Sequence, residues 1–128
     1  MIDETTISVQ VRYAECDAQR VAHHSTYPIW LEMARTELLR VNGMSYRDCE
    51  DIGAFFVVVT LGLKYRKPAI YDEVITVRVW HTSVGRVKID HAYEVKRGEE
   101  LLVSATSTLA CVDRNGRPRG VPDALFGE

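Results

Sequence analysis

Hydrophobic and polar residues alternate with a period of two near the start of the chain. Over residues 5–13, Ile7, Val9 and Val11 alternate with polar neighbours, which is typical of a half-buried β-strand. Residues 14–25 (AECDAQRVAHHS) break this alternation and are mostly polar. We therefore predict a loop after the first strand.

The pattern changes to a helical spacing after this loop. Apolar side chains recur every three or four residues over 26–43, as on one face of an α-helix. They are Trp30, Met33, Ala34, Leu38 and Val41. Ser25 or Thr26 can cap the start of this helix, and Gly43 can end it because glycine readily adopts the left-handed conformation. A second, short helix is predicted over 45–53, because Ser45 can cap its start with Asp48 three residues on as a capping box, and Gly53 can end it.

From Phe55 onward the apolar residues again alternate with a period of two, which predicts strands. Turn sequences at 83–86 and 97–100 divide this region, and the turn at 113–116 ends it. The tail that follows is expected to be irregular.

Successive strands with short turns must pair mostly antiparallel, and their sheet is the only large surface that can bury the helix face. The predicted fold class is α+β, with a five-stranded antiparallel sheet wrapped around one long helix in a single domain over 1–128. The last four strands are predicted to form a meander. The face of the sheet away from the helix keeps several apolar residues, which favours burial against another subunit. These residues are Val58, Val74, Trp80, Leu102 and Val112.

Composition narrows the function classes. The 128 residues are 46% hydrophobic and 27% charged with a net charge of −2, so a general nucleic-acid footprint is not supported. The three cysteines are widely spaced and form no CxxC pair, so free thiols and no metal site are expected. Neither a secretory signal nor a long apolar run is seen, and a cytoplasmic location is expected.

Reactive side chains are concentrated between the first strand and the long helix. They are Glu15, Cys16, Asp17, His23, His24 and Tyr27. A helix N-terminus offers unpaired amides and a partial positive charge, which stabilise an oxyanion. A carboxylate beside it can act as a nucleophile or as a base for water. Acyl transfer fits this arrangement, and a loop acid that only caps the helix is the alternative.

Several motifs along the chain resemble those of one known family. They include VRYAECD from Val11 to Asp17, HSTY from His24 to Tyr27, WLEMARTELLR from Trp30 to Arg40, and then GMSY, KYRKPA, YDEV and CVDRNGRP. Together they are similar to the 4-hydroxybenzoyl-CoA thioesterase family of hotdog-fold proteins, including its branch associated with the bacterial Tol–Pal system. The resemblance extends over nearly the whole chain.

This resemblance implies hydrolysis of an acyl-CoA thioester by a homodimer or homotetramer with active sites at the subunit interface. It implies Asp17 as the catalytic carboxylate and the backbone N–H of His24 as the group that polarises the thioester carbonyl. Coenzyme A is part of the substrate, and no cofactor is expected. The family often has Gly and Asn where this chain has Arg20 and Thr26, so Arg20 is expected to alter the loop or to face an acidic substrate group.

Further residues are candidates for binding the substrate. Tyr27 follows His24 closely, and the phosphates of coenzyme A call for basic residues such as Arg66, Lys67 and Arg86 at predicted strand ends and turns. Cys16 is not a predicted nucleophile, because the strand period turns its side chain away from the neighbouring aspartate.

Two other functions stay open at this point. A dehydratase of 3-hydroxyacyl thioesters would use His23 or His24 with Glu32, although an ion pair between Glu32 and Arg35 is the simpler prediction. A non-catalytic protein that binds acyl thioesters is the second. The acyl group, small aromatic or short-to-medium aliphatic, and its carrier, coenzyme A or acyl carrier protein, also stay open.

Overall fold

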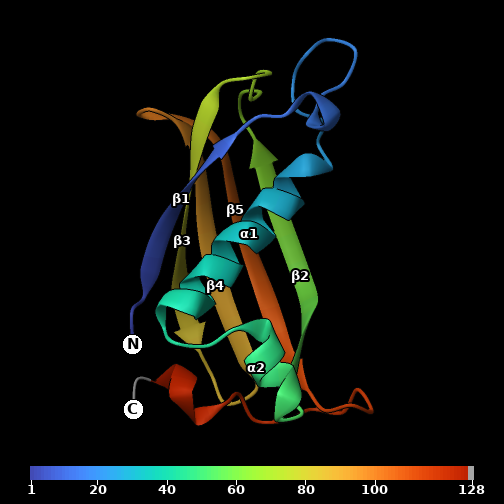
Figure 1. The fold of residues 1–128 in the computed structure, drawn as a ribbon, viewed down its shortest axis with the longest axis vertical. Coiled ribbons are helices and arrows are strands. Elements are labelled where there is room, and N and C mark those ends of the chain that lie inside the picture. Colours follow the sequence, from blue (N-terminus) through green and yellow to red (C-terminus); the bar gives the residue numbers. More distant parts are fainter. Residues whose placement is uncertain (127–128) are drawn as a thin grey trace.

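The computed structural model describes residues 1–126. Five antiparallel strands form one sheet in the order β1-β3-β4-β5-β2. The strands are β1 (Glu4–Gln10), β2 (Phe55–Tyr65), β3 (Val74–Val84), β4 (Lys88–Arg97) and β5 (Glu100–Val112). The sheet curves around the long helix α1 (Thr26–Val41), and the short helix α2 (Tyr46–Asp51) lies near the end of α1 (Figure 1). This arrangement confirms the predicted sheet and long helix.

Two 3-10 turns complete the chain. They are η1 (Tyr13–Glu15) in the first loop and η2 (Asp123–Phe126) near the C-terminus. The tail is therefore not wholly irregular as predicted, and residues 127–128 lie outside the described part.

The order of the strands differs from the predicted meander. Strand β2 pairs with β5 at one edge, while only β3, β4 and β5 follow one another. The amides of Arg66 and Lys67 both donate to the carbonyl of Leu102 in β5, at 2.8 and 3.1 Å. These bonds tie the end of β2 to β5, and residues 66–73 then carry the chain back across to β3.

Helix α1 buries a wider face than predicted. Trp30, Ala34 and Leu38 are buried as expected, but Met33 and Val41 are 46% and 39% exposed. Residues outside the predicted stripe take part in the buried side; they are Tyr27, Leu31, Arg35 and Leu39. The curved sheet wraps around the helix (Figure 1). The side of α1 that contacts the sheet is therefore wider than one row of apolar residues.

Two register shifts change which residues face the helix. In β2, Val58 pairs with Leu109 and Thr60 pairs with Thr108, so Val59 is the extra residue of a β-bulge. Val58 therefore lies on the helix side and not on the far face as predicted. Leu102, also predicted on the far face, has no partner at the shift between β4 and β5 and is fully buried.

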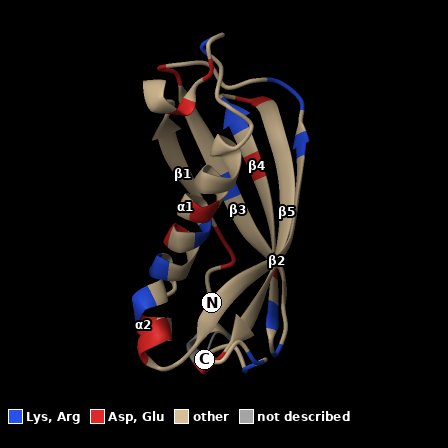
Figure 2. Ribbon diagram, turned by 90° about the vertical axis from the view of Figure 1, so that its right-hand side faces the viewer, with Lys and Arg blue, Asp and Glu red and all other residues tan. Residues whose placement is uncertain are grey.

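The two α-helices lie on the same face of the sheet, and among residues 1–126 no helix covers the opposite face (Figure 2). On that face the guanidinium of Arg78 lies 4.3 Å from the centre of the Trp80 ring and pairs with Glu4 and Glu94. None of the described helices combines the length and the apolar character needed to cross a membrane.

Candidate active site

Buried Glu15 fixes the loop between β1 and α1. Its side-chain oxygens accept hydrogen bonds from the amide of Arg12 at 2.8 Å and from the indole N–H of Trp30 at 2.9 Å. Its carbonyl accepts from the amide of His23 and from the hydroxyl of Thr26, at 2.8 and 3.1 Å. These bonds hold both ends of the loop against the first turn of the helix.

Glu15 is ionised in this position. Burial alone would raise its pKa, but the hydrogen bonds from Arg12 and Trp30 lower the pKa below its ordinary value. The sequence placed Glu15 among the reactive side chains without identifying this structural role. A buried indole N–H needs an acceptor, so Trp30 was the signal that could have found it.

Asp17 lies at the exposed tip of this loop. Its amide donates to the carbonyl of Val21 at 2.9 Å, and its Oδ1 accepts from the amide of Gln19 at 2.8 Å. Arg20 closes the turn by donating its amide to the carbonyl of Asp17, at 3.0 Å. Arg20 has a φ of 64°, which is the left-handed region that glycine favours. The turn is thus glycine-like even though a large side chain occupies it.

The start of α1 has no side-chain cap. Ser25 holds the cap position, but its hydroxyl is bonded to Nδ1 of His23 at 2.7 Å. The hydroxyl of Thr26 is bonded to the carbonyl of Glu15, so the prediction that either residue caps the helix is wrong. Among the hydrogen bonds of residues 1–126, none uses the amide of His24.

His24 opens onto a pocket of about 280 Å³ that also includes Tyr27, Arg66 and Lys67 in its lining. The hydroxyl of Tyr65 in β2 donates to the carbonyl of His24 at 3.0 Å, which holds the helix start against the end of that strand. The structure thus brings together four of the six predicted site residues, while Asp17 does not line this pocket within one chain.

Tyr27 lines the pocket with its ring, while its hydroxyl is engaged elsewhere in the protein. It is 2% exposed, and its hydroxyl accepts the amide of Ala69 at 3.0 Å. Its ring packs edge-to-face against Trp30 and Tyr65. Burial raises its pKa, so the phenol stays neutral at pH 7.

The predicted basic residues differ in their availability. Lys67 is paired with the carboxylate of Glu100, whereas Arg66 is exposed beside the pocket. Arg86 lies in the turn between β3 and β4, at the opposite end of the sheet from the loop that carries Asp17 (Figure 1). A single chain therefore offers Arg66 as its available cation at this site.

Two further expectations concern Cys16 and Glu32. Burial, together with the charges of Glu15 and Asp17, raises the pKa of Cys16, which agrees with its exclusion as a nucleophile. The ion pair predicted between Glu32 and Arg35 is not formed: Arg35 points into the protein and donates to the hydroxyl of Tyr93 at 3.2 Å.

Residues 19–104 match the family model of the thioesterase superfamily. The chain belongs to this family. It is 35% identical to the protein YneP of Bacillus subtilis (strain 168), over 83% of this chain and 78% of that protein. It is 29% identical to the acyl-CoA thioester hydrolase YbgC of Escherichia coli O6:H1, over 94% of this chain and 91% of that protein.

A solved structure agrees with this membership. The DHNA-CoA thioesterase of Staphylococcus aureus superposes with a TM-score of 0.87 at 28% identity, covering 91% of this chain and 80% of that one. The hotdog fold and the thioester hydrolase class implied by the resemblance are therefore confirmed. The family match includes His24 but begins after Asp17, so it does not test the role of that carboxylate.

Proposed function

We propose that the protein hydrolyses the thioester of an acyl-CoA with a small aromatic or short-to-medium aliphatic acyl group. The observation that carries this proposal is the unused amide of His24, at an uncapped helix start beside an open pocket. Such an amide, together with the helix dipole, stabilises the negative charge that develops on a thioester oxygen under attack. The name of the relative YbgC supports coenzyme A as the thiol carrier. A substrate of this kind fits a cytoplasmic protein.

Asp17 is the proposed catalytic carboxylate. As a base it takes a proton from water while the water oxygen bonds to the carbonyl carbon. As a nucleophile it bonds to that carbon itself and forms a mixed anhydride, which water then hydrolyses. In both routes the carbon–sulfur bond breaks and the sulfur gains a proton, so the products are a free acid and free coenzyme A. The exposed carboxylate, on a loop that Glu15 joins to the helix start, supports this role.

The edge strand β2 supports a homodimer. It exposes four apolar residues, between 39% and 51%: Val57, Val58, Val59 and Leu61. An exposed apolar edge strand is a template for pairing with another chain. Antiparallel pairing of two β2 strands about a twofold axis sets the Tyr65 end of one against the Phe55 end of the other. Each His24 pocket then lies at the interface, and the sheet end that carries Arg86 lies on the side of the partner's pocket.

The decisive experiment follows free thiol with a chromogenic reagent over a panel of aliphatic and aromatic acyl-CoAs. Asp17→Asn is expected to lower kcat at least about 100-fold. Asp90→Asn is the control, because Asp90 lies within β4, which β5 separates from the β2 edge, and its Oδ1 accepts the hydroxyl of Thr108 at 2.6 Å. This control should retain wild-type activity.

Each other outcome has a meaning. Full activity in Asp17→Asn would refute the role of the carboxylate. Hydration of crotonyl-CoA without thiol release would establish the dehydratase, and saturable binding without turnover would establish a binding protein. Sedimentation tests the dimer: twice the 14.5 kDa chain mass is expected, and Val59→Lys, which places a charge on the edge strand, should shift the protein toward monomer.

A further inference from the structure

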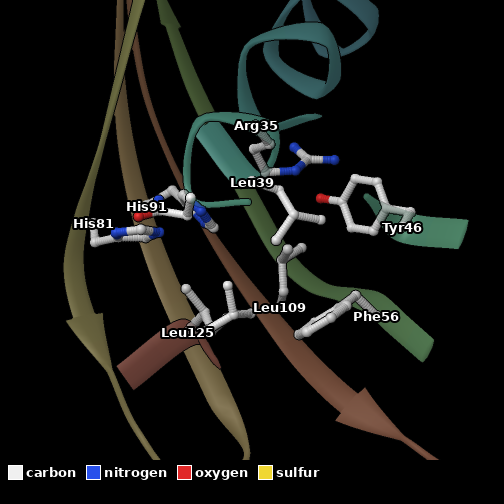
Figure 3. Close-up of a pocket in the computed structure, with 10 residues that line it drawn as sticks. Arg35, Leu39, Tyr46, Phe56, His81, His91, Leu109 and Leu125 are labelled. Carbon is white, nitrogen blue, oxygen red and sulfur yellow. The ribbon is translucent and has the colours of Figure 1, made fainter. Parts of the chain in front are cut away.

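Polar side chains are buried beneath the second half of α1, away from its start. Arg35 and His91 are only 8% and 5% exposed. Figure 3 shows them with His81 and Tyr46 around a small cavity, with the Tyr46 hydroxyl directed toward the guanidinium. The hydroxyl of Tyr93 accepts one hydrogen bond from Arg35.

Within the described residues, no acid balances the charge of Arg35. Its Nε has no hydrogen-bond partner, and neither has Nδ1 of His81 or of His91. Nδ1 of His81 lies 3.8 Å from the carboxylate of Asp3, which is too far for a hydrogen bond. Burying an unpaired charge costs several kcal/mol, and buried polar groups without partners are rare. Three such nitrogens around one cavity point to an oxygen that a ligand supplies.

The histidines do not add charge to this cluster at neutral pH. Burial, together with His81 and Arg35, lowers the pKa of His91 to about 3, and burial also lowers the pKa of His81. Both rings are therefore neutral at pH 7 and can donate or accept a hydrogen bond. Arg35 is the only cation that lines the cavity in the described part of the chain.

The shape of the site limits what can bind. The cavity holds about 20 Å³, which is room for one water-sized atom such as a single carboxylate oxygen. A groove of about 300 Å³ leads to it between α1, α2 and β2, and Arg35, Tyr46 and Phe56 line both spaces. Val58 and Leu109 add apolar walls to the groove. A ligand would thus lay an apolar chain in the groove and place a small polar end at Arg35.

We propose that Arg35 binds the terminal carboxylate of the acyl group, so that the preferred substrates are thioesters of dicarboxylic acids. This inference rests on the proposed function, because pairing of the β2 strands sets the Phe56 end of the groove against the partner's Tyr65 end. The groove of one subunit then receives the acyl group that is cleaved at the other subunit's helix start.

A carboxylate fits this site better than a neutral group does. It matches the paired N–H groups of a guanidinium and neutralises its charge, whereas a hydroxyl would leave the charge of Arg35 unbalanced. Glu32 and Glu50 also line the groove, but both are exposed, so solvent screens their repulsion of an anion.

The test compares adipyl-CoA with hexanoyl-CoA, which have six acyl carbons each and differ in the terminal carboxylate. Wild type is expected to prefer adipyl-CoA in kcat/KM. Arg35→Met should reduce that preference about 100-fold, mainly through KM for adipyl-CoA, because a desolvated charge pair is lost. Arg40→Met is the matched control: Arg40 lies on the same helix, is exposed and pairs with the carboxylate of Glu37, so the wild-type preference should remain.

The folding of the variant is checked by thermal unfolding. Because no acid pairs with Arg35 in the described part of the chain, Arg35→Met leaves no partner charge unpaired and removes the desolvation cost of the guanidinium. Arg35→Lys provides a second variant that keeps the charge and should keep part of the preference. Hydrolysis of hexanoyl-CoA through Asp17 with no preference for adipyl-CoA would overturn this inference and leave the proposed function intact. If 6-hydroxyhexanoyl-CoA were preferred over both adipyl-CoA and hexanoyl-CoA, the inference that Arg35 binds a carboxylate would be wrong. No turnover on any thioester would overturn both proposals.

A heterodimer tests whether the groove acts across the interface. A subunit with Asp17→Asn and a subunit with Arg35→Met are co-expressed with different tags and purified together. If Asp17 acts with the partner's Arg35, one site of the heterodimer is intact, and about half of the wild-type activity on adipyl-CoA is expected. Activity no higher than that of the separate variants would show that both residues serve the same subunit's site, and would overturn this arrangement.

Discussion

The loop around Asp17 and the cluster around Arg35 both hold polar groups against α1, one at its exposed start and the other beneath its second half. In the loop, the bonds that fix Glu15 join residues no more than 15 positions apart. In the cluster, Arg35 reaches a tyrosine 58 positions away. A short stretch of sequence therefore contains the bonds that fix the loop, whereas the contacts of the buried cluster form only once the sheet has formed.

The largest expected effect tests whether the loop depends on its buried anion. Glu15→Ala removes the acceptor of the Trp30 indole and of the Arg12 amide, and should lower the free energy of unfolding by about 3 kcal/mol. Urea unfolding measures this change. Glu99→Ala, at an exposed turn position, should change stability by less than about 0.5 kcal/mol. Equal losses in the two variants would mean that Glu15 is not the anchor of the loop.

Acid should weaken the buried cluster before it affects the loop. The pKa of His91 is about 3 in the folded protein and about 6.5 when unfolded, so protonation favours the unfolded chain. The stability from neutral His91 is present above pH 6.5 and is lost as the pH falls toward 3. Between pH 7 and pH 5 the loss is about 2 kcal/mol.

Urea unfolding across that pH range measures the slope. His91→Gln, which cannot titrate, should lose most of the dependence on pH, while His24→Gln at the exposed helix start should keep it. A wild-type slope in His91→Gln would place the titrating group elsewhere.

A smaller effect concerns the turn that follows Asp17. Arg20 is held at a φ of 64°, a conformation that costs a residue with a side chain about 1 kcal/mol. Arg20→Gly should raise the free energy of unfolding by about that amount, as measured by urea unfolding. Arg20→Ala keeps the strain and should not raise it. Stabilisation by alanine would show that the side chain, and not the backbone, carries the cost.

The smallest expected effect separates thiol from carboxylate chemistry in the loop. Because its pKa is raised, Cys16 is a thiol at pH 7, and its Sγ donates to the carbonyl of Arg12. Cys16→Ser keeps a donor there, and kcat should stay within about twofold of wild type. Thiol-release assays measure this, and a drop comparable to that expected for Asp17→Asn would make Cys16 part of the chemistry.

Sequence patterns predicted the local features of this fold well. The capping box of Ser45 and Asp48 has both of its hydrogen bonds, and Gly43 ends α1 with a φ of 88°. The turns at 83–86 and 97–100 lie between the strands where they were expected. Each of these features depends on residues a few positions apart, so a short stretch of sequence contains the whole interaction.

Long-range features escaped the same reasoning. The pairing of β2 with β5 involves partners about 50 residues apart, such as Leu61 with Ser107, and no periodicity encodes it. The buried orientation of the Arg35 side chain was not predicted, because Glu32 lies three positions earlier and this spacing is typical of a surface ion pair. For the candidate site, loop position and family resemblance predicted roles for His24 and Asp17, which remain predictions, and they did not point to the cluster that faces the groove.

The bulge in β2 lets this strand lose one residue without changing the wall of the groove. Val59 is the one residue between Val58 and Thr60 without a partner in β5. Deleting its codon would restore an unbroken ladder in which Val58 still pairs with Leu109 and Thr60 with Thr108. Because strand side chains alternate between faces, Phe56 and Val58 would stay in the wall, and Leu61 to Tyr65 would keep their places. A deletion inside a regular strand turns one half of it over, whereas this one would leave both the groove and the loop that carries Asp17 unchanged.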